Sequence, residues 1–331
     1  MISGPALRGA IPALATPFRA DDPAALDTAA LARLAVRAMA GGAAAAVVCG
    51  STGEAAAMAP EEQACAVQAV VEAVGHRLPV IAGVGGSCTE AAVALARGAA
   101  LCGASALLVS APPYVKPGQE GLRAHVRAVA AAAGLPIVLY DVPSRAGVAF
   151  ADETIAVLRD AGAIHAVKDA TADLARPVRL RRLCGVDLPQ FSGDDATAAA
   201  HLAMGGAGCV SVTANVAPAL CAALQASWAA GDLDRFAEIR DLLAPLHEAL
   251  FAETNPVPVK AALELLGLCD AAPRLPLTRA TEATRARLAR ILGRVAPLED
   301  ECRTPPPGPA ARPLGATARG CRPVAAMGGG R

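Results

Sequence analysis

Eight short apolar runs recur along this chain at starts about 20–36 residues apart, separated by longer Ala-, Leu- and Arg-rich segments with helical periodicity. This spacing is the length of one strand-plus-helix unit, and runs without polar alternation are typical of parallel strands covered on both faces. Eight units in succession predict an α/β fold, the closed (β/α)8 or TIM barrel. An open doubly wound sheet is the alternative. The expected strands are Ile11–Ala15, Ala44–Val48, Val80–Ala82, Ala106–Ser110, Ile137–Tyr140, Ile164–Lys168, Leu188–Phe191 and Gly208–Ser211.

The 331 residues exceed what such a barrel needs, which is about 250 residues. The strand signal stops at about Gly231, and three helices are expected beyond it, at Asp232–Leu250, Val257–Leu266 and Thr278–Leu292, the last capped by Thr278. From about Ala296 the composition shifts to Pro, Gly, Arg and Ala, which cannot bury enough apolar surface to fold. We therefore expect a barrel over 1–231, a C-terminal helical domain over 232–295 and a disordered tail over 296–331.

Charge and composition exclude several classes of function. Thirty basic residues balance thirty acidic ones, so no overall field would attract nucleic acid or an anionic membrane. The chain contains no uninterrupted run of about 20 apolar residues, so we expect no membrane span. The first residues lack the pattern of a signal peptide. The ten cysteines and five histidines show no ligand spacing, so we expect no metal site. A cytoplasmic enzyme with reduced thiols fits these features.

Lysine and tyrosine are scarce in this chain. Only three of the thirty basic residues are lysines, and the only tyrosines are Tyr114 and Tyr140. Lys168 ends the sixth expected strand, where a desolvated amine can attack a carbonyl and form a Schiff base, which arginine cannot do. The alternative for a lysine at a strand end is a solvated side chain. Lys116 and Lys260 follow no expected strand, so we assign them solvated or structural roles.

The residues at the carboxyl ends of the other strands complete a possible site, because these ends converge on one mouth of a barrel. The segment Gly50–Glu54 offers backbone amides and the hydroxyls of Ser51 and Thr52, a combination that suits a substrate carboxylate. These hydroxyls could instead cap the following helix. Tyr140 ends the fifth strand and Tyr114 follows the fourth. Each phenol, hydrogen-bonded to a hydroxyl such as that of Thr52, could shuttle protons, although Tyr140 could also be a core residue.

Three further positions belong to the same mouth. Arg145 follows the fifth strand and can hold a second carboxylate through two parallel hydrogen bonds, or serve as a surface ion-pair partner. Gly193 follows the seventh strand and Val210 lies in the eighth. The chemistry that this inventory favours is condensation of the Lys168 amine with a 2-oxo acid. Loss of water and of a proton would then give an enamine, a carbon nucleophile.

Taken together, these segments resemble the dihydrodipicolinate synthase family, the pyruvate-dependent class I aldolase barrels. The resemblance extends from about Gly9 to Leu292. It implies Lys168 as the Schiff-base lysine for pyruvate, with no separate cofactor, and Tyr140 as the acid/base. It also implies a relay of Thr52 and Tyr114, with Tyr114 reaching a neighbouring subunit's site in a homotetramer built as a dimer of dimers. The segments that carry it are Gly50–Glu54, Tyr140–Arg145, Val167–Thr171, Ser192–Asp195, Ser211–Asn215 and Asn255–Lys260.

The resemblance also implies the substrate-binding residues Ser51, Thr52, Arg145, Gly193 and Val210. Arg145, with the segment Ser192–Asp195, favours the synthase branch, in which the second substrate is aspartate semialdehyde. N-acetylneuraminate lyase and 2-keto-3-deoxy sugar-acid aldolase are the alternatives within the superfamily, and a non-catalytic barrel is the alternative outside it.

Two positions depart from the synthase pattern, Ser51 where Thr is usual and Asp141 where Asn is usual. The positions that bind the inhibitor lysine in sensitive synthases also differ, so we expect this enzyme to be insensitive to lysine. These positions match Pro60, Gln63, Ser87, Ala91 and Pro113.

Overall fold

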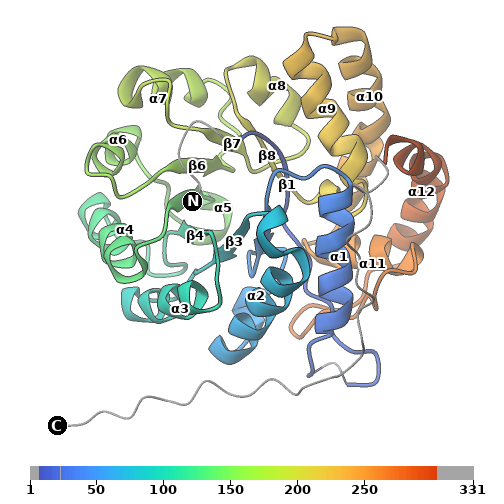
Figure 1. Cartoon of the computed structure of the whole chain (residues 1–331), viewed down its shortest axis with the longest axis horizontal. Coiled ribbons are helices and arrows are strands. Elements are labelled where there is room, and N and C mark those ends of the chain that lie inside the picture. Colours follow the sequence, from blue (N-terminus) through green and yellow to red (C-terminus); the bar gives the residue numbers. More distant parts are fainter. Residues whose placement is uncertain (1–6, 23, 304–331) are drawn as a thin grey trace.

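The computed structural model describes residues 7–22 and 24–303. Eight parallel strands form a ring in the order β1-β8-β7-β6-β5-β4-β3-β2, with helices around it (Figure 1). The predicted (β/α)8 barrel is therefore confirmed. The strands are β1 Gly9–Pro12, β2 Ala46–Val48, β3 Val80–Gly83, β4 Ala106–Ser110, β5 Ile137–Asp141, β6 Ala166–Asp169, β7 Gln190–Ser192 and β8 Gly208–Ser211.

Contacts between β1 and β2 close the ring. Ala13 forms a parallel bridge with Val47, and the Leu14 N–H donates to the Val47 carbonyl at 2.9 Å. At the N-terminal end of the same two strands the Ala44 N–H donates to the Ala10 carbonyl, also at 2.9 Å. Because both ends of the strand order are joined, the open-sheet alternative is wrong.

Residues of strands β1 to β6 alternate between two apolar clusters, as the twofold period of a strand requires. In β5, Val138 and Tyr140 belong to the cluster inside the ring, whereas Ile137 and Leu139 pack outward against the helices. The inner cluster is small and built largely of Ala, Val, Ile and Leu, with Phe191 as its phenylalanine. Aromatic residues make up only 2% of the chain, so most of this filling is aliphatic.

The barrel helices follow the strands in sequence. Their N-terminal signals are local ones: Asp27, for example, accepts a hydrogen bond from the Ala30 N–H at 2.8 Å and so caps α1. The helices are α1 Thr28–Ala40, α2 Pro60–Val74, α3 Thr89–Leu101, α4 Gln119–Ala133, α5 Pro143–Ala146, α6 Asp152–Asp160, α7 Arg176–Cys184, α8 Ala198–Ala203 and α9 Pro218–Ala230.

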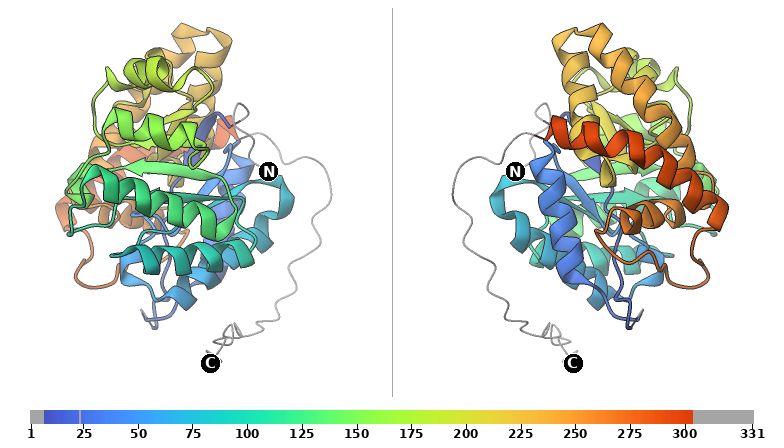
Figure 2. Two further views of the ribbon diagram at one scale, coloured as in Figure 1. Left: turned by 90° about the vertical axis from the view of Figure 1, so that its left-hand side faces the viewer. Right: turned by 90° about the vertical axis from the view of Figure 1, so that its right-hand side faces the viewer.

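The C-terminal helices α10 Leu233–Leu250, α11 Val257–Leu265 and α12 Glu282–Cys302 gather on one side of the barrel beside α9 and α1 (Figures 1 and 2). Their existence and order agree with the prediction. The predicted boundary at residue 295 falls inside α12, which continues to Cys302. The remainder of the expected disordered tail, 304–331, lies outside the described residues.

The start of α12 corrects one prediction. Thr281, and not Thr278, caps this helix, since its hydroxyl accepts from the Thr284 N–H at 3.3 Å. The predicted limits of β4 and β8 are correct, whereas those of the other strands shift by one to three residues: the first strand is Gly9–Pro12 and the seventh is Gln190–Ser192. The sixth strand ends at Asp169, one residue beyond Lys168.

Candidate active site

Lys168 and Tyr140 face each other inside the mouth of the barrel. They are register partners on β6 and β5, and the Lys168 Nζ lies 4.0 Å from the centroid of the Tyr140 ring. The two residues are only 6% and 8% exposed. The alternative of a solvated lysine is therefore wrong, since this amine lies in the apolar interior against the face of a phenol.

Gly193 makes room for the Lys168 side chain. A Cβ at position 193 would lie 3.2 Å from the Lys168 Cε, 2.9 Å from the Ala170 Cβ and 3.1 Å from the Asp169 carbonyl oxygen. Glycine is needed here because of close approach, since contacts this short force neighbouring atoms to shift. Val210 lies in the same inner cluster as Tyr140 and is 2% exposed.

Asn255 joins two of the expected substrate-binding residues. Its Nδ2 donates to the Thr52 Oγ1 at 3.0 Å, and its backbone carbonyl accepts from the Arg145 guanidinium at 3.1 Å. Thr52 is buried in the turn after β2, Ser51 beside it is partly buried, and Arg145 is exposed. Asn255, two residues before α11, thus links the turn after β2 to the segment after β5.

A buried ion pair joins the turn after β2 to α11. Glu54 Oε1 accepts from the Lys260 Nζ at 2.7 Å, and Glu54 Oε2 accepts from the Arg274 N–H at 2.9 Å. The Lys260 Nζ also lies 4.2 Å from the Phe18 ring centroid. Burial lowers the pKa of Lys260, and the adjacent Glu54 carboxylate opposes that change. The structural role expected for Lys260 is confirmed, and Lys116 is exposed as expected.

Tyr114 lies apart from this group. Its side chain is 94% exposed and its backbone has a φ of 74°, in the left-handed region that disfavours side chains. Val115 beside it is 58% exposed. A single copy of the chain therefore does not bring Tyr114 into the buried site with Lys168.

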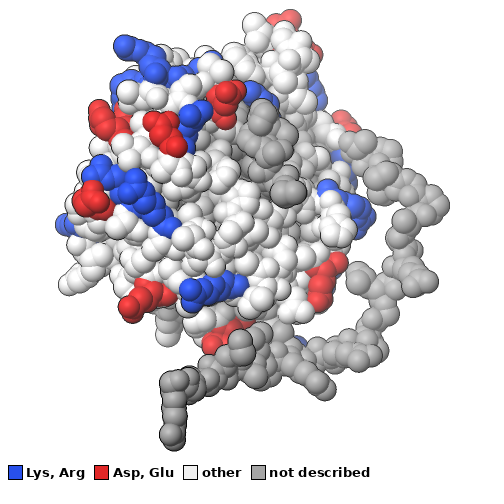
Figure 3. Space-filling model, turned by 60° about the vertical axis from the view of Figure 1, so that its left-hand side comes forward, with Lys and Arg blue, Asp and Glu red and all other residues white. Residues whose placement is uncertain are grey.

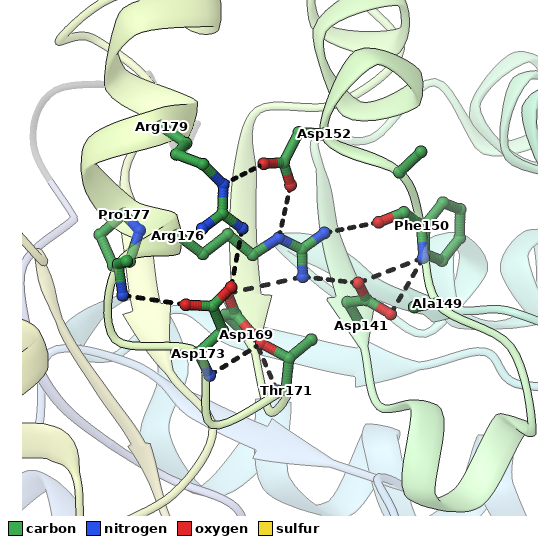
Figure 4. A network of polar contacts seen from close by, with 12 residues as sticks. Asp141, Ala149, Phe150, Asp152, Asp169, Thr171, Asp173, Arg176, Pro177 and Arg179 are labelled. Carbon is green, nitrogen blue, oxygen red and sulfur yellow. Dashed lines mark hydrogen bonds and ion pairs between the residues drawn. The ribbon is translucent and has the colours of Figure 1, made fainter.

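A buried polar network lies behind the strands that carry Lys168 and Tyr140 (Figure 4). Arg176, the first residue of α7, is 3% exposed and donates to Asp141 Oδ2 at 2.7 Å, to Asp152 Oδ1 at 2.8 Å and to the Phe150 carbonyl at 2.6 Å. Its NH1 also lies 3.6 Å from Asp169 Oδ2. Burial raises the pKa of Asp141, although the neighbouring guanidinium opposes this effect.

Asp195 organises the chain that follows β8. One carboxylate oxygen accepts from the Val212 N–H at 2.8 Å and the Thr213 N–H at 3.1 Å, and the other accepts from the Ser211 hydroxyl. Within residues 7–22 and 24–303, no group of three or more His, Cys, Asp and Glu side chains is arranged to hold a metal ion.

Arg176 was missed at the sequence level, and Asn255 was named only as the first residue of a segment that carries the family resemblance. Arginine is abundant in this chain, so nothing in the sequence singles out Arg176. The motif Asn255–Lys260 did carry a signal, since it contributed to the family resemblance, but it could not indicate that Asn255 contacts Thr52 from 203 residues away.

The outer surface is mixed in charge. The face drawn in Figure 3 carries basic and acidic side chains interspersed, with uncharged surface between them. Among the described residues, no helix combines the length and the apolar character needed to cross a bilayer.

A closed parallel barrel with a buried lysine and tyrosine at its mouth defines the class of (β/α)8-barrel enzymes, whose sites lie at the carboxyl ends of the strands. The model of the dihydrodipicolinate synthetase family matches residues 6–295. The chain therefore belongs to that family, as the sequence motifs predict.

Relatives with a described function or structure agree with this assignment. The chain is 50% identical over 278 residues to the 4-hydroxy-tetrahydrodipicolinate synthase of Rhodospirillum centenum, covering 84% of this chain and 94% of that protein. The crystal structure of the dihydrodipicolinate synthase of Thermotoga maritima superimposes with a TM-score of 0.84 at 36% identity, covering 88% and 99% of the two chains. A monomeric dihydrodipicolinate synthase variant superimposes with a TM-score of 0.84 at 37% identity, covering 88% and 97%.

Proposed function

We propose that this protein is a 4-hydroxy-tetrahydrodipicolinate synthase, a lyase that condenses pyruvate with aspartate semialdehyde on the route to diaminopimelate and lysine. The observation that carries the proposal is the buried Lys168 amine, 4.0 Å from the Tyr140 ring centroid at the mouth of the barrel. The 50% identity to a synthase of that name supports the choice of substrates.

In the proposed mechanism the Lys168 amine attacks the keto carbon of pyruvate, and loss of water gives an imine. The covalent imine replaces any separate cofactor. Removal of a proton from the methyl carbon gives an enamine, which attacks the aldehyde carbon of the second substrate and becomes an imine again. Attack on this imine by the second substrate's amine, or by water, then releases the Lys168 amine. Tyr140 is the proposed acid/base, with Thr52 and Tyr114 as the rest of the relay. The amides and hydroxyls at Ser51 and Thr52 would bind the pyruvate carboxylate.

Arg145 supports aspartate semialdehyde over a polyhydroxylated partner. Its guanidinium is exposed and oriented by the Asn255 carbonyl at 3.1 Å, which leaves other N–H groups for a carboxylate. Gly193 and Val210 would line the same cavity. Steady-state assays with pyruvate plus aspartate semialdehyde, with N-acetylneuraminate and with 2-keto-3-deoxygluconate test this choice. Absence of turnover with the first pair would overturn it.

Trapping of the imine tests the covalent step. Borohydride reduction with pyruvate should add the pyruvate mass to the peptide that contains Lys168. Lys168→Arg should abolish this adduct and lower kcat at least ~10³-fold, because the nucleophile is lost. A Lys168→Arg variant with full turnover would contradict the mechanism.

The proposed assembly is a homotetramer built as a dimer of dimers and located in the cytoplasm. The 94% exposure of Tyr114 supports a partner subunit at this position. If Tyr114 acts in a neighbour's site, a mixture of the inactive variants Tyr114→Phe and Lys168→Arg should regain activity after refolding together, because a mixed dimer has one intact site. Light scattering gives the mass of the assembly, and cell fractionation gives its location.

A further inference from the structure

We propose that Arg176 is a positioning residue that holds Lys168 and Tyr140 opposite each other by tying together the ends of β5 and β6 from behind. This inference rests on the proposed function, in which that pair carries the chemistry. It assigns a role to a residue that contacts neither member of the pair directly.

The register of the two strands provides the first step. Tyr140 pairs with Lys168, and the next position along, Asp141, pairs with Asp169. Because side chains alternate across a strand, the first pair points into the barrel and the second points out towards the helices. Any shift of the two carboxylates relative to each other is therefore transmitted, one residue along, to the amine and the phenol.

The second step is the charge balance behind the strands. The Asp141 and Asp169 side chains are 0% and 4% exposed, and like charges placed opposite each other on neighbouring strands destabilise the pairing. A single guanidinium nitrogen, NH1 of Arg176, lies 2.7 Å from Asp141 Oδ2 and 3.6 Å from Asp169 Oδ2. Arg176 is thus the cation that lies between two buried carboxylates, one on each strand.

The third step is the rigidity of Arg176 itself. Its other nitrogens are fixed by the Asp152 carboxylate at 2.8 Å and the Phe150 carbonyl at 2.6 Å, both from the segment that follows β5 (Figure 4). A planar guanidinium with contacts on every nitrogen has one position available, which a lysine ammonium cannot reproduce. This fixed cation sets the separation of the two strand ends.

The test compares Arg176→Leu with a matched variant on the same helix. Arg176→Leu should lower kcat and the rate of borohydride-trapped imine formation on the order of 10²-fold, the effect of misplacing a reacting group by about 1 Å. Arg179→Leu removes the exposed partner that holds the same Asp152 at 2.8 Å, and should stay within about twofold of the parent. An unchanged rate in Arg176→Leu, or an equal loss in Arg179→Leu, would overturn the proposal.

Two further variants separate positioning from simple loss of stability. Asp141→Asn removes one of the two facing charges, so Arg176→Leu/Asp141→Asn should recover at least about tenfold over Arg176→Leu, as expected of coupled neighbours. Arg176→Lys keeps the charge without the fork and should fall between the parent and Arg176→Leu. A double variant no better than Arg176→Leu contradicts the repulsion argument.

Hydrogen exchange distinguishes failure of this inference from failure of the proposed function. If the parent protein forms no adduct at Lys168, the proposed function is wrong. The proposal that Arg176 fixes the ends of β5 and β6 is then tested by hydrogen exchange alone. Arg176→Leu should then accelerate exchange of the amides in β5 and β6 and leave those of β2 and β3 unchanged. Unchanged protection of the β5 and β6 amides would overturn the proposal that Arg176 fixes the ends of these strands.

Discussion

The Lys260 Nζ lies 2.7 Å from the Glu54 Oε1 in an ion pair whose two side chains are 0% and 2% exposed. This pair joins α11 of the C-terminal domain to the turn that carries Ser51 and Thr52. Lys260→Met should destabilise the protein by about 3–5 kcal/mol, because an unpaired carboxylate stays buried. Urea unfolding measures the loss.

The matched control for this pair removes both charges. Glu54→Gln/Lys260→Met should be markedly more stable than Lys260→Met alone, since no uncompensated charge remains. Equal stability of the single and double variants would show that the cost comes from lost packing around the Phe18 ring instead of from the charge.

Tyr140→Phe separates the phenol hydroxyl from the ring. The ring would still lie beneath the Lys168 amine, so borohydride trapping with pyruvate should persist. Turnover should fall about 10²–10⁴-fold, the contribution typical of a positioned acid/base. Mass spectrometry of the trapped peptide and steady-state assays give the two quantities, and parallel loss of both would mean that the ring contact itself was disturbed.

Gly193→Ala should disable the site through close contact with Lys168. The new methyl group would lie 2.9 Å from the Ala170 Cβ and 3.2 Å from the Lys168 Cε, so we expect overpacking of about 1–3 kcal/mol and slower imine formation. Gly98→Ala is the control, because a Cβ there meets no atom within 4 Å and α3 would gain helix propensity. A fully active Gly193→Ala variant would argue against the close approach.

Acid should weaken the fold through buried His201. This ring is 4% exposed, and both its nitrogens lack a hydrogen-bond partner among the described residues. Burial lowers the pKa of His201 below its ordinary value of 6.5, with Asp169 opposing. Because the pKa of His201 is lowered in the folded state, the unfolded chain binds a proton more readily than the folded protein. The free energy of unfolding is therefore at its full value above pH 6.5 and decreases as the pH falls through the folded-state pKa.

His201→Leu should therefore flatten the dependence of Tm on pH below 6.5 and leave stability at pH 8 equal or higher, since no unsatisfied polar atom remains. Thermal unfolding at a series of pH values checks this. If Tm of the variant falls with pH as steeply as Tm of the parent, groups other than His201 cause the loss of stability in acid.

Lysine should not inhibit this enzyme below the millimolar range. Gln63 is buried and its amide donates to the Ala55 carbonyl at 3.0 Å and the Met58 carbonyl at 3.3 Å, so it is occupied within its own helix and turn. Pro60, Ser87 and Pro113 are exposed and, with Ala91, offer no carboxylate for the lysine amines. Steady-state rates with added lysine check this, and sub-millimolar inhibition would refute it.

The barrel was predictable because its signal is local and repeated. Each strand is an apolar run of a few residues, and eight of them at regular spacing leave few other architectures. Strand limits were less accurate because hydrogen bonding to neighbours sets them. Thr281, not Thr278, caps α12, and it is also held by Glu253, whose carboxylate accepts from the Thr281 N–H at 3.0 Å and its hydroxyl at 2.8 Å. Nothing local to residues 278–281 indicates that partner.

In the candidate site, too, the sequence identified some residues and missed others. Lys168 and Tyr140 were identifiable because each is a rare residue at a strand end, and the structure brings them together. The supporting residues were not, because their roles depend on contacts between distant segments. Arg176 and Asp141 are 35 residues apart, and Asn255 and Thr52 are 203 apart. Tyr114 is 94% exposed in the single chain, and its role in a neighbouring subunit's site remains a prediction that rests on the proposed homotetramer.

The bond between Asn255 and Thr52 has a consequence for how the protein is made. Its two ends are separated by most of the sequence, and the Glu54–Lys260 pair spans a similar distance. A ribosome must therefore release most of the chain before the turn that contains Thr52 and Glu54 forms its contacts with Asn255 and Lys260. A growing polypeptide that already contains Lys168 should remain unreactive towards 2-oxo acids until α11 emerges.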